Sequence, residues 1–304
     1  MSIDPTRGIA GLKGALRYVR AYRDQIFVVK LGGDVLNDAE VLDQVAAQIA
    51  LLSSLSIRLV VVHGGGPQAT ALSRRLGQEP TIVAGRRVTD DAALEVAKMV
   101  YAGALSTDLV AALREHRVQA VGLSGVDADL ITAHRRPPVS LVDDAGATRE
   151  VDFGHVGDVD RVDPRVITTL AESRFVPVVA SLAGDDEGNI YNVNADTVAE
   201  SLAVALRAQK LIFLTGAPGV LRDRNDPSTL VTFADPDARG VAHDVEPPPV
   251  DGLFDEAAHG LLAAADRRRG DKLPQELDLS RPGQRQGRSP SPFGRRSWCR
   301  SPTR

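Results

Sequence analysis

Val28-Val29-Lys30-Leu31-Gly32-Gly33 and Val60-Val61-Val62-His63-Gly64-Gly65-Gly66-Pro67 are the two stretches that decide the fold. Each is an apolar run, typical of a buried strand, that ends in glycines. Glycine lacks Cβ, so the backbone of such a turn can approach an anion with several N–H groups, and the following helix adds its positive end. Two such turns, one directly preceded by a lysine, predict paired phosphate-binding turns. The alternative is that each strand end needs glycine for purely steric reasons.

Strand and helix patterns alternate around these two turns. Apolar runs predict strands near 26–31, 57–62, 118–123, 129–133, 176–182 and 210–215, and helical spacing predicts helices near 9–22, 38–54, 67–77, 91–116 and from 195 onward. Residues 134–163 are polar and rich in turn formers. Such alternation predicts an α/β protein with a mainly parallel sheet covered by helices on both faces.

The composition excludes several classes of protein. The chain has 304 residues, 43% of them hydrophobic, and a net charge of -4, so it can bury a full core but offers no basic field for nucleic acid. A single cysteine, Cys299, excludes an internal disulfide framework and fits a reducing compartment. We find no apolar leader and expect no bilayer-spanning run, which predicts a cytoplasmic protein without a membrane partner.

The composition changes after residue 222. Ten of the eighteen prolines lie from Asp223 onward, and residues 281–304 hold seven arginines and no acidic residue. A segment of this kind buries too little apolar surface to order itself, which predicts a flexible basic tail over 223–304. A nucleic-acid-binding tail is the alternative.

Six motifs, in this order, resemble those of acetylglutamate kinase in the amino acid kinase superfamily. They are Lys30-Leu31-Gly32-Gly33, His63-Gly64-Gly65-Gly66-Pro67-Gln68, Gly85-Arg86-Arg87-Val88-Thr89-Asp90, Gly122-Leu123-Ser124-Gly125, Asn192-Val193-Asn194-Ala195-Asp196-Thr197 and Lys210-Leu211-Ile212-Phe213-Leu214-Thr215. The resemblance covers about residues 8–222 and implies a three-layer αβα sandwich with an atypical C-terminal part. The domains implied are an N-terminal helix at 1–22, an N-terminal lobe for the amino acid at 23–180, the start of a nucleotide-binding C-terminal lobe at 181–222, and the divergent tail.

The resemblance implies that ATP phosphorylates the side-chain carboxylate of N-acetyl-L-glutamate, giving N-acetyl-L-glutamyl 5-phosphate in arginine biosynthesis. A carboxylate with a reference pKa of about 4.3 is ionised at pH 7 and needs no general base. The site must instead supply positive charge to the transferred phosphoryl group. The catalytic residues implied are Lys30, which contacts that group, and Asp196, which orients the lysine. The phosphate-binding residues implied are Gly32, Gly33, Gly64 and Gly65.

The substrate residues are implied in the same way. Arg87 resembles the arginine that pairs with the substrate α-carboxylate, and Asn192 resembles the asparagine that holds the α-carboxyl and amide end. The substrate-binding set is Gly65, Gly66, Arg87 and Asn192, and the nucleotide-binding set is Thr215, Gly216 and Gly219. In the alternative reading, Arg87 is a solvated charge, Asn192 a turn former and Asp196 an N-cap. No protein-bound metal site is expected, and Mg²⁺ is expected only with ATP.

Two departures from the family pattern stand out. Thr215-Gly216 occupies the place where family members usually carry threonine and aspartate. The family's later glycine-methionine turn with Pro-Lys, whose lysine contacts the leaving oxygen, has no counterpart here, because Lys272 is the single lysine after Lys210 and its surroundings do not match. Either the chain has diverged into a weak kinase, or its reading frame shifts after about Leu221. The abrupt end of the resemblance favours the frame shift.

Three further expectations stay open beside the leading one. The substrate alternative is a carrier-linked aminoadipate of lysine biosynthesis, and the alternative of another class is a catalytically inactive amino-acid-binding subunit. The stripe Ile9, Leu12, Leu16 and Val19 resembles the N-terminal helix that joins dimers into hexamers in arginine-inhibited family members. A homo-oligomer, dimer or hexamer, with L-arginine as feedback inhibitor is therefore expected. The alternative is a helix that packs on its own subunit.

Overall fold

The computed structural model describes residues 16–83, 86–142 and 148–216, together with 219, 229 and 263–265. Its central sheet has the strand order β14-β13-β1-β2-β10-β5. These strands are Ala263–Ala265, Lys210–Leu214, Ile26–Leu31, Arg58–His63, Val176–Ala180 and Ala120–Ser124. Every pairing is parallel except that of β13 with β14. The predicted mainly parallel sheet is confirmed.

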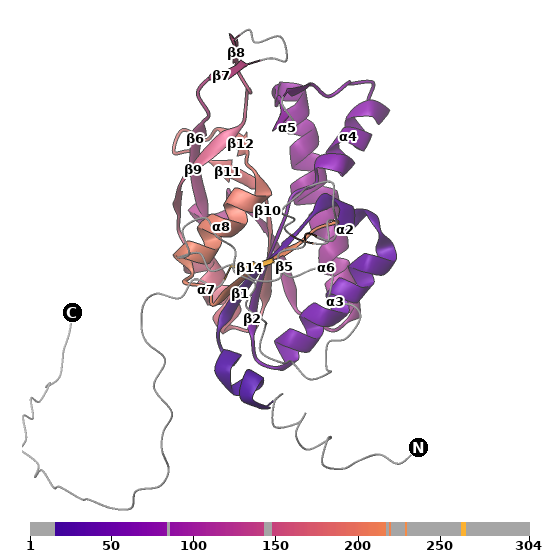
Figure 1. The fold of residues 1–304 in the computed structure, drawn as a ribbon, viewed down its shortest axis with the longest axis vertical. Helices are drawn as coiled ribbons and strands as arrows, with labels where there is room; N and C mark the ends of the chain where they lie inside the picture. The colour runs from indigo at the N-terminus through magenta and orange to yellow at the C-terminus, as the bar shows by residue number, and fades with distance from the viewer. Residues whose placement is uncertain are drawn as a thin grey trace, which may run out of the picture. The chain divides into compact units, whose positions relative to one another are not determined.

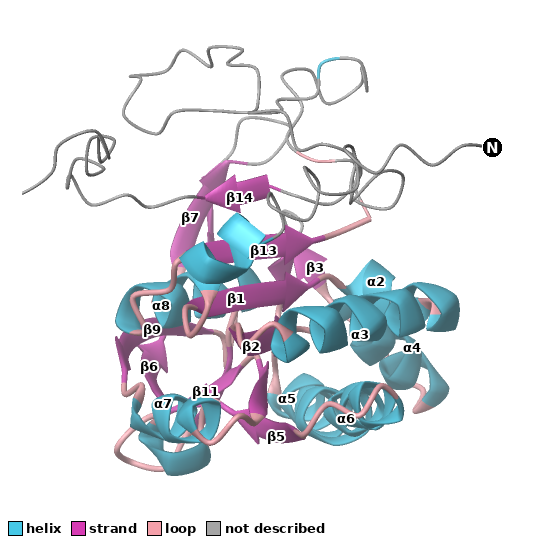
Figure 2. Cartoon of the chain, turned by 90° about the horizontal axis from the view of Figure 1, so that it is seen from below, coloured by secondary structure: helices cyan, strands magenta, loops and turns pink. Residues whose placement is uncertain are grey.

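Helices cover both faces of this sheet (Figure 2). On one side lie α2, α3, α4, α5, the π-helix η1 and α6, which span Gly33–Asn37, Ala39–Ser54, Gly66–Arg75, Asp91–Ala97, Lys98–Leu105 and Ser106–Glu115. On the other lie α7 and α8, which span Arg165–Glu172 and Ala195–Ala205. A short 3₁₀ turn, η2, covers Asp127–Asp129. The sequence predicted most of these helices, including a helix over 98–105, but it did not predict α2, α7 or the π-helical character of η1.

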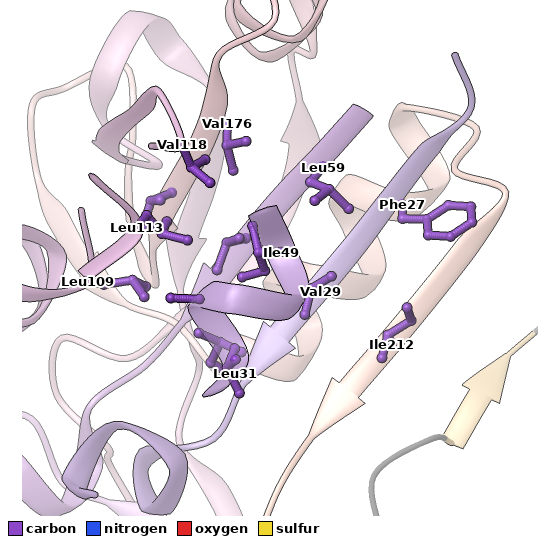
Figure 3. Close-up of a cluster of buried hydrophobic side chains, with 14 of the residues drawn as sticks. Phe27, Val29, Leu31, Ile49, Leu59, Leu109, Leu113, Val118, Val176 and Ile212 are labelled. Carbon is purple, nitrogen blue, oxygen red and sulfur yellow. The ribbon is translucent and has the colours of Figure 1, made fainter. Parts of the chain in front are cut away.

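Burial on both faces explains the unbroken apolar runs of the central strands. Because side chains alternate along a strand, Phe27, Val29 and Leu31 pack toward α3 and α6, whereas Val28 packs toward α8. Figure 3 shows the first of these clusters, in which Leu109 of α6 lies among residues of β1, β2 and α3. The α8 face of β1 is the one that matters for the site, since Lys30 shares it with Val28.

A second, four-stranded sheet has the order β12-β11-β6-β9. Its strands are Ile190–Asn192, Leu182–Gly184, Ile131–Arg135 and Gly157–Val162, and two hairpins add β3 with β4 at Ile82–Val83 and Arg86–Arg87, and β7 with β8 at Val139–Val142 and Thr148–Val151. The β7–β8 hairpin is drawn beyond the ends of β6 and β9 in Figure 1. Three strands, β7, β8 and β9, therefore lie within 134–163, where the sequence predicts polar turns. Their side chains are mostly solvent-facing, so the hydrophobic signal of a strand is weak there.

The helical run Asp91–Glu115 contains enough apolar residues to resemble a membrane-spanning helix. It has 25 residues and a mean hydropathy of 1.4 in its most apolar window, so by length and composition it could cross a membrane. The expectation that no run approaches this length was wrong. In the fold, 44% of that window is buried, and Leu109 and Leu113 belong to the core, so packing against the sheet accounts for the apolar residues.

Residues 16–22 are helical, and the start of the predicted N-terminal helix, with Ile9 and Leu12, lies outside the described residues. Leu16 is 46% exposed. The helix end contacts its own subunit, because the Tyr22 ring meets Phe27 edge-on at 5.3 Å and lies under Lys210 Nζ at 4.9 Å. Of the two stripe members within the described residues, Leu16 is exposed and Val19 is partly buried, while the last turn is anchored on β1 and β13.

Candidate active site

Lys30 and Asp196 meet at the carboxyl end of β1. The Lys30 Nζ lies 2.7 Å from the Asp196 Oδ1, and the two side chains are 13% and 55% exposed. Asp196 lies in the first turn of α8, and Asn194 is the N-cap of this helix. The Asn194 Oδ1 accepts a hydrogen bond from the Asp196 N–H at 2.7 Å. Since Asn194 caps the helix, the Asp196 carboxylate is left to pair with Lys30. The reading of Asp196 as a mere N-cap does not describe this arrangement.

The second glycine turn joins β2 to α4 and packs tightly on two sides. A Cβ on Gly64 would lie 3.3 Å from Ala195 Cβ, and one on Gly65 would lie 2.4 Å from Leu105 Cδ1. A Cβ on Gly66, by contrast, would meet nothing within 4 Å. In the described part of the chain, the N–H groups of Gly64 and Gly65 donate to no backbone carbonyl. The turn thus holds free donors beside the N-terminus of α4, which suits an anion.

The first glycine turn joins β1 to α2 and is fixed to its neighbours. The Gly32 N–H donates to Leu214 O at 2.7 Å, so this group belongs to the sheet edge and is not a free phosphate donor. A Cβ on Gly33 would lie 2.7 Å from Pro67 Cδ, and Gln68 Nε2 donates to Gly33 O at 3.0 Å. Pro67 and Gln68 belong to the first turn of α4. The two glycine turns therefore lie side by side.

The expected nucleotide residues follow β13, next to the first glycine turn. A Cβ on Gly216 would lie 3.1 Å from Asp34 Oδ2 in α2. The Asp34 carboxylate thus stands beside the position where the family pattern has an aspartate. Gly219 has a φ of +139°, which glycine adopts readily. Thr215 follows the strand directly.

Arg87 lies on β4 and reaches the start of α4. Its Nη2 donates to Gly66 O at 3.0 Å and to Thr70 Oγ1 at 2.6 Å. Tyr101, on the π-helix, is buried, and a Cβ on Gly65 would lie 2.8 Å from Tyr101 Cδ1. Burial raises the pKa of the Tyr101 phenol, and the positive charge of Arg87 opposes that shift. Thr70 and Tyr101 were not anticipated from the sequence, which carries no local signal for contacts across 17 and 14 positions.

Asn192 ends β12 and approaches the same region from the second sheet. Its Nδ2 donates to the Thr89 Oγ1 at 3.2 Å, and Thr89 follows Arg87 by two residues. Asp196 follows Asn192 by four positions, and an extended chain covers about 3.3 to 3.6 Å per residue. The structure therefore links Asn192 to Thr89, two positions after Arg87, and places Asn192 four positions before Asp196, the partner of Lys30.

Two buried polar atoms near the glycine turns lack partners. The His63 ring is fully buried, its Nδ1 lies 2.9 Å from Gly64 O, and its Nε2 has no hydrogen-bond partner. Burial lowers the pKa of His63, so the ring is neutral at pH 7 and donates from Nδ1 to Gly64 O. Gln68 Oε1 is likewise without a partner. His134 and His155 pair with Asp160 and Asp91. No group of three His, Cys, Asp or Glu side chains able to hold a metal occurs among the described residues.

Comparison with known proteins agrees with this geometry. The amino acid kinase family matches residues 25–238, which extends past residue 222, the expected end of the resemblance. The acetylglutamate kinase of Myxococcus xanthus is 52% identical over 236 residues, which are 77% of this chain and 75% of that protein. The N-acetylglutamate synthase of Neisseria gonorrhoeae, solved with coenzyme A and N-acetyl-glutamate, has a TM-score of 0.58 and 29% identity over 71% of this chain and 47% of its own.

The same synthase solved with coenzyme A and L-arginine has a TM-score of 0.57 and 25% identity, over 70% of this chain and 49% of its own. The family match covers more than half of the chain, and the Myxococcus xanthus relative is covered over three quarters of its length. The family match spans the part of the chain that carries both glycine turns, Lys30 and Asp196. The chain belongs to the amino acid kinase family, and within it to the acetylglutamate kinases.

Proposed function

We propose that this chain transfers the γ-phosphoryl group of ATP to the side-chain carboxylate of N-acetyl-L-glutamate, forming N-acetyl-L-glutamyl 5-phosphate. The observation that carries the proposal is the Lys30–Asp196 pair, 2.7 Å apart where two glycine turns and the N-terminus of α8 converge. A largely buried lysine beside free N–H groups is what a developing negative charge requires. The relatives of this family support the assignment to arginine biosynthesis.

The reaction needs positioning more than proton transfer. The attacking carboxylate is ionised at pH 7, so the chain has no proton to remove. Lys30 would hold its ammonium against the transferred phosphoryl oxygens, and Asp196 would fix the direction of that ammonium. The Gly33, Gly64 and Gly65 N–H groups would contact phosphate oxygens. Because phosphoryl transfer spreads charge over these oxygens, such contacts stabilise the transition state more than the ground state.

The substrate would be held at its other end by Arg87 and Asn192. Arg87 Nη2 is engaged with Gly66 O and Thr70, which leaves its remaining N–H groups for a carboxylate. Holding the α-carboxylate there would direct the side-chain carboxylate along the α4 N-terminus toward Lys30. The residues also fit ATP, because the Gly64 and Gly65 N–H groups donate to no backbone carbonyl in the described part of the chain and could bind its phosphates. Mg²⁺, arriving with the nucleotide, would neutralise part of its charge.

The domain and partner assignments rest on the same proposal. We place the amino acid on residues 23–180, with Asn192 contacting it from 181–222, and the nucleotide on 181–222, with Thr215, Gly216 and Gly219 beside it. L-arginine as a feedback ligand is supported by the structure of the Neisseria gonorrhoeae synthase that contains it. A homo-oligomer in the cytoplasm, without a membrane or nucleic-acid partner, completes the proposal. Of the predicted tail at 223–304, the structure describes only residues 229 and 263–265. Lys272 lies outside the described residues.

The test is an acyl phosphate assay on the full chain. Hydroxylamine traps the product as a hydroxamate, so a signal with ATP and N-acetyl-L-glutamate supports the proposal. Turnover only with an aminoadipate substrate would reassign the substrate. Ligand-induced melting shifts without turnover would instead indicate an amino-acid-binding subunit. Translating the gene in its other two frames accompanies the assay: a Gly-x-x-Pro-Lys turn in one of them supports the frame shift after about Leu221, and its absence from a verified gene contradicts it.

A further inference from the structure

Thr89 is a fully buried polar residue that the proposed reaction does not use. It is 0% exposed, and its Oγ1 accepts the Asn192 Nδ2 at 3.2 Å. A buried hydroxyl that accepts a hydrogen bond from a site residue is costly to leave unpaired, so the contact constrains both groups. Thr89 also lies two positions after Arg87, which puts the side chains of the two residues on the same side of an extended segment.

The backbone of Thr89 is fixed on both sides by one loop. The Thr89 N–H donates to Phe153 O at 2.9 Å, and Thr89 O accepts the His155 N–H at 2.6 Å. Gly154, between them, has a φ of +70°, and a Cβ there would lie 2.3 Å from Thr89 O. Only glycine fits this close approach. The loop therefore fixes the backbone of Thr89 by two hydrogen bonds. Because a β-branched side chain has few rotamers, the position of Oγ1 is restricted as well.

The same loop also holds Asn192. The Asn192 N–H donates to His155 O at 2.8 Å, so His155 links the backbones of Thr89 and Asn192. The loop is tied down in turn, because Arg135 Nε donates to Gly154 O at 3.1 Å and Arg135 Nη2 pairs with Asp152. The loop at 152–155 thus fixes the backbone positions of both Thr89 and Asn192, so their hydrogen bond does not depend on the substrate.

From this arrangement we propose that Thr89 is a positioning residue that fixes the orientation of the Asn192 side-chain amide before the substrate binds. An amide has two N–H donors and one carbonyl acceptor. With one N–H committed to Thr89, Asn192 presents a single orientation of Oδ1 and its second N–H. An N-acylated α-amino acid offers the complement, an amide N–H donor and a carboxylate acceptor. The inference rests on the proposed function for the identity of this ligand.

Two substitutions separate positioning from packing. Thr89→Val keeps the shape but removes the acceptor, whereas Thr89→Ser keeps the acceptor. Thr132→Val is the matched control, because Thr132 Oγ1 also accepts a side-chain donor at 3.2 Å, from Arg161, on the second sheet. We expect Thr89→Val to raise the KM and Kd for N-acetyl-L-glutamate about tenfold, with kcat and the KM for ATP nearly unchanged. Thr89→Ser should restore most of that affinity. Equal KM values for Thr89→Val and Thr132→Val would overturn the inference.

A second readout does not depend on activity. The full chain has five asparagines, so labelling them with ¹⁵N gives few side-chain amide signals, and Asn192→Asp identifies the one that matters. That signal should move in Thr89→Val and stay in Thr89→Ser and Thr132→Val. An unmoved Asn192 signal in Thr89→Val overturns the inference. A wild-type chain that makes no acyl phosphate contradicts the proposed function instead, and the Asn192 signal still decides the role of Thr89.

Discussion

Replacing Lys30 by methionine should separate catalysis from stability. Methionine keeps an unbranched stem of similar length in a site that is 13% exposed, so packing changes little. The Asp196 carboxylate, left without its partner, is 55% exposed and becomes hydrated. Because the substitution removes the less exposed charge and leaves the exposed one hydrated, the free energy of unfolding should fall by only about 1 kcal/mol, as for pairs at the surface.

The effect on kcat should be far larger. Loss of one preorganised charge at a phosphoryl group costs a factor of about 100 or more, equivalent to about 2.7 kcal/mol of transition-state stabilisation. The KM for N-acetyl-L-glutamate should change much less, because Lys30 faces the reacting end. The assay is hydroxamate formation at saturating substrates, with urea unfolding on the same samples.

Asp196→Asn is the companion variant. It keeps a hydrogen-bond acceptor for Lys30 but removes the charge, so its kcat should fall less than that of Lys30→Met. If the wild-type chain turns over and Lys30→Met keeps the same kcat in a folded protein, Lys30 does not touch the reacting atoms and the site is wrongly assigned.

Three further outcomes are expected. Arg87→Lys should raise the KM for the amino acid about 10- to 100-fold with little change for ATP, since lysine lacks the planar fork; loss of nucleotide binding instead would move this arginine to the other lobe. Gly65→Ala should lower the free energy of unfolding by about 1 to 3 kcal/mol, and with it the melting temperature, because the new Cβ would collide with Tyr101 and Leu105. Gly66→Ala should leave the melting temperature unchanged, and equal melting curves for the two variants would contradict this packing. Light scattering should give a smaller assembly for a chain that starts at Arg23 than for the intact chain, and equal masses would remove the N-terminal helix from assembly.

Local patterns were enough to determine the core of the fold. The apolar run ending at Leu31 is a strand over the predicted residues, and the run ending at His63 agrees within one residue. Such strands are buried on both faces, so their composition alone marks them. The two glycine turns follow the same logic, because a strand end that must approach a helix or an anion excludes Cβ. The order of the motifs then identified the family.

Strands with little buried surface could not be found in this way. In β8, at Thr148–Val151, three of four residues are exposed, and in β9, at Gly157–Val162, only Gly157 is buried, so neither strand carries a clear apolar pattern. The π-helical turn at Lys98–Leu105 has the composition of any helix. Two of its side chains, Tyr101 and Leu105, lie against Gly65, a contact that no local window of the sequence contains.

The sequence by itself determined which residue types the site uses, and the tertiary structure decided what holds them. Lys30 was marked by its place before a glycine turn, but its pairing with Asp196 depends on α8 returning to the edge of β1. Thr89 and Asn192 are 103 positions apart, and their hydrogen bond exists because one loop, Asp152–His155, binds both strands. Hydrogen-bond pairing across such distances follows from chain topology. A sequence pattern reflects only the interactions of a residue with its near neighbours in the chain, such as strand alternation, helix capping and tight turns.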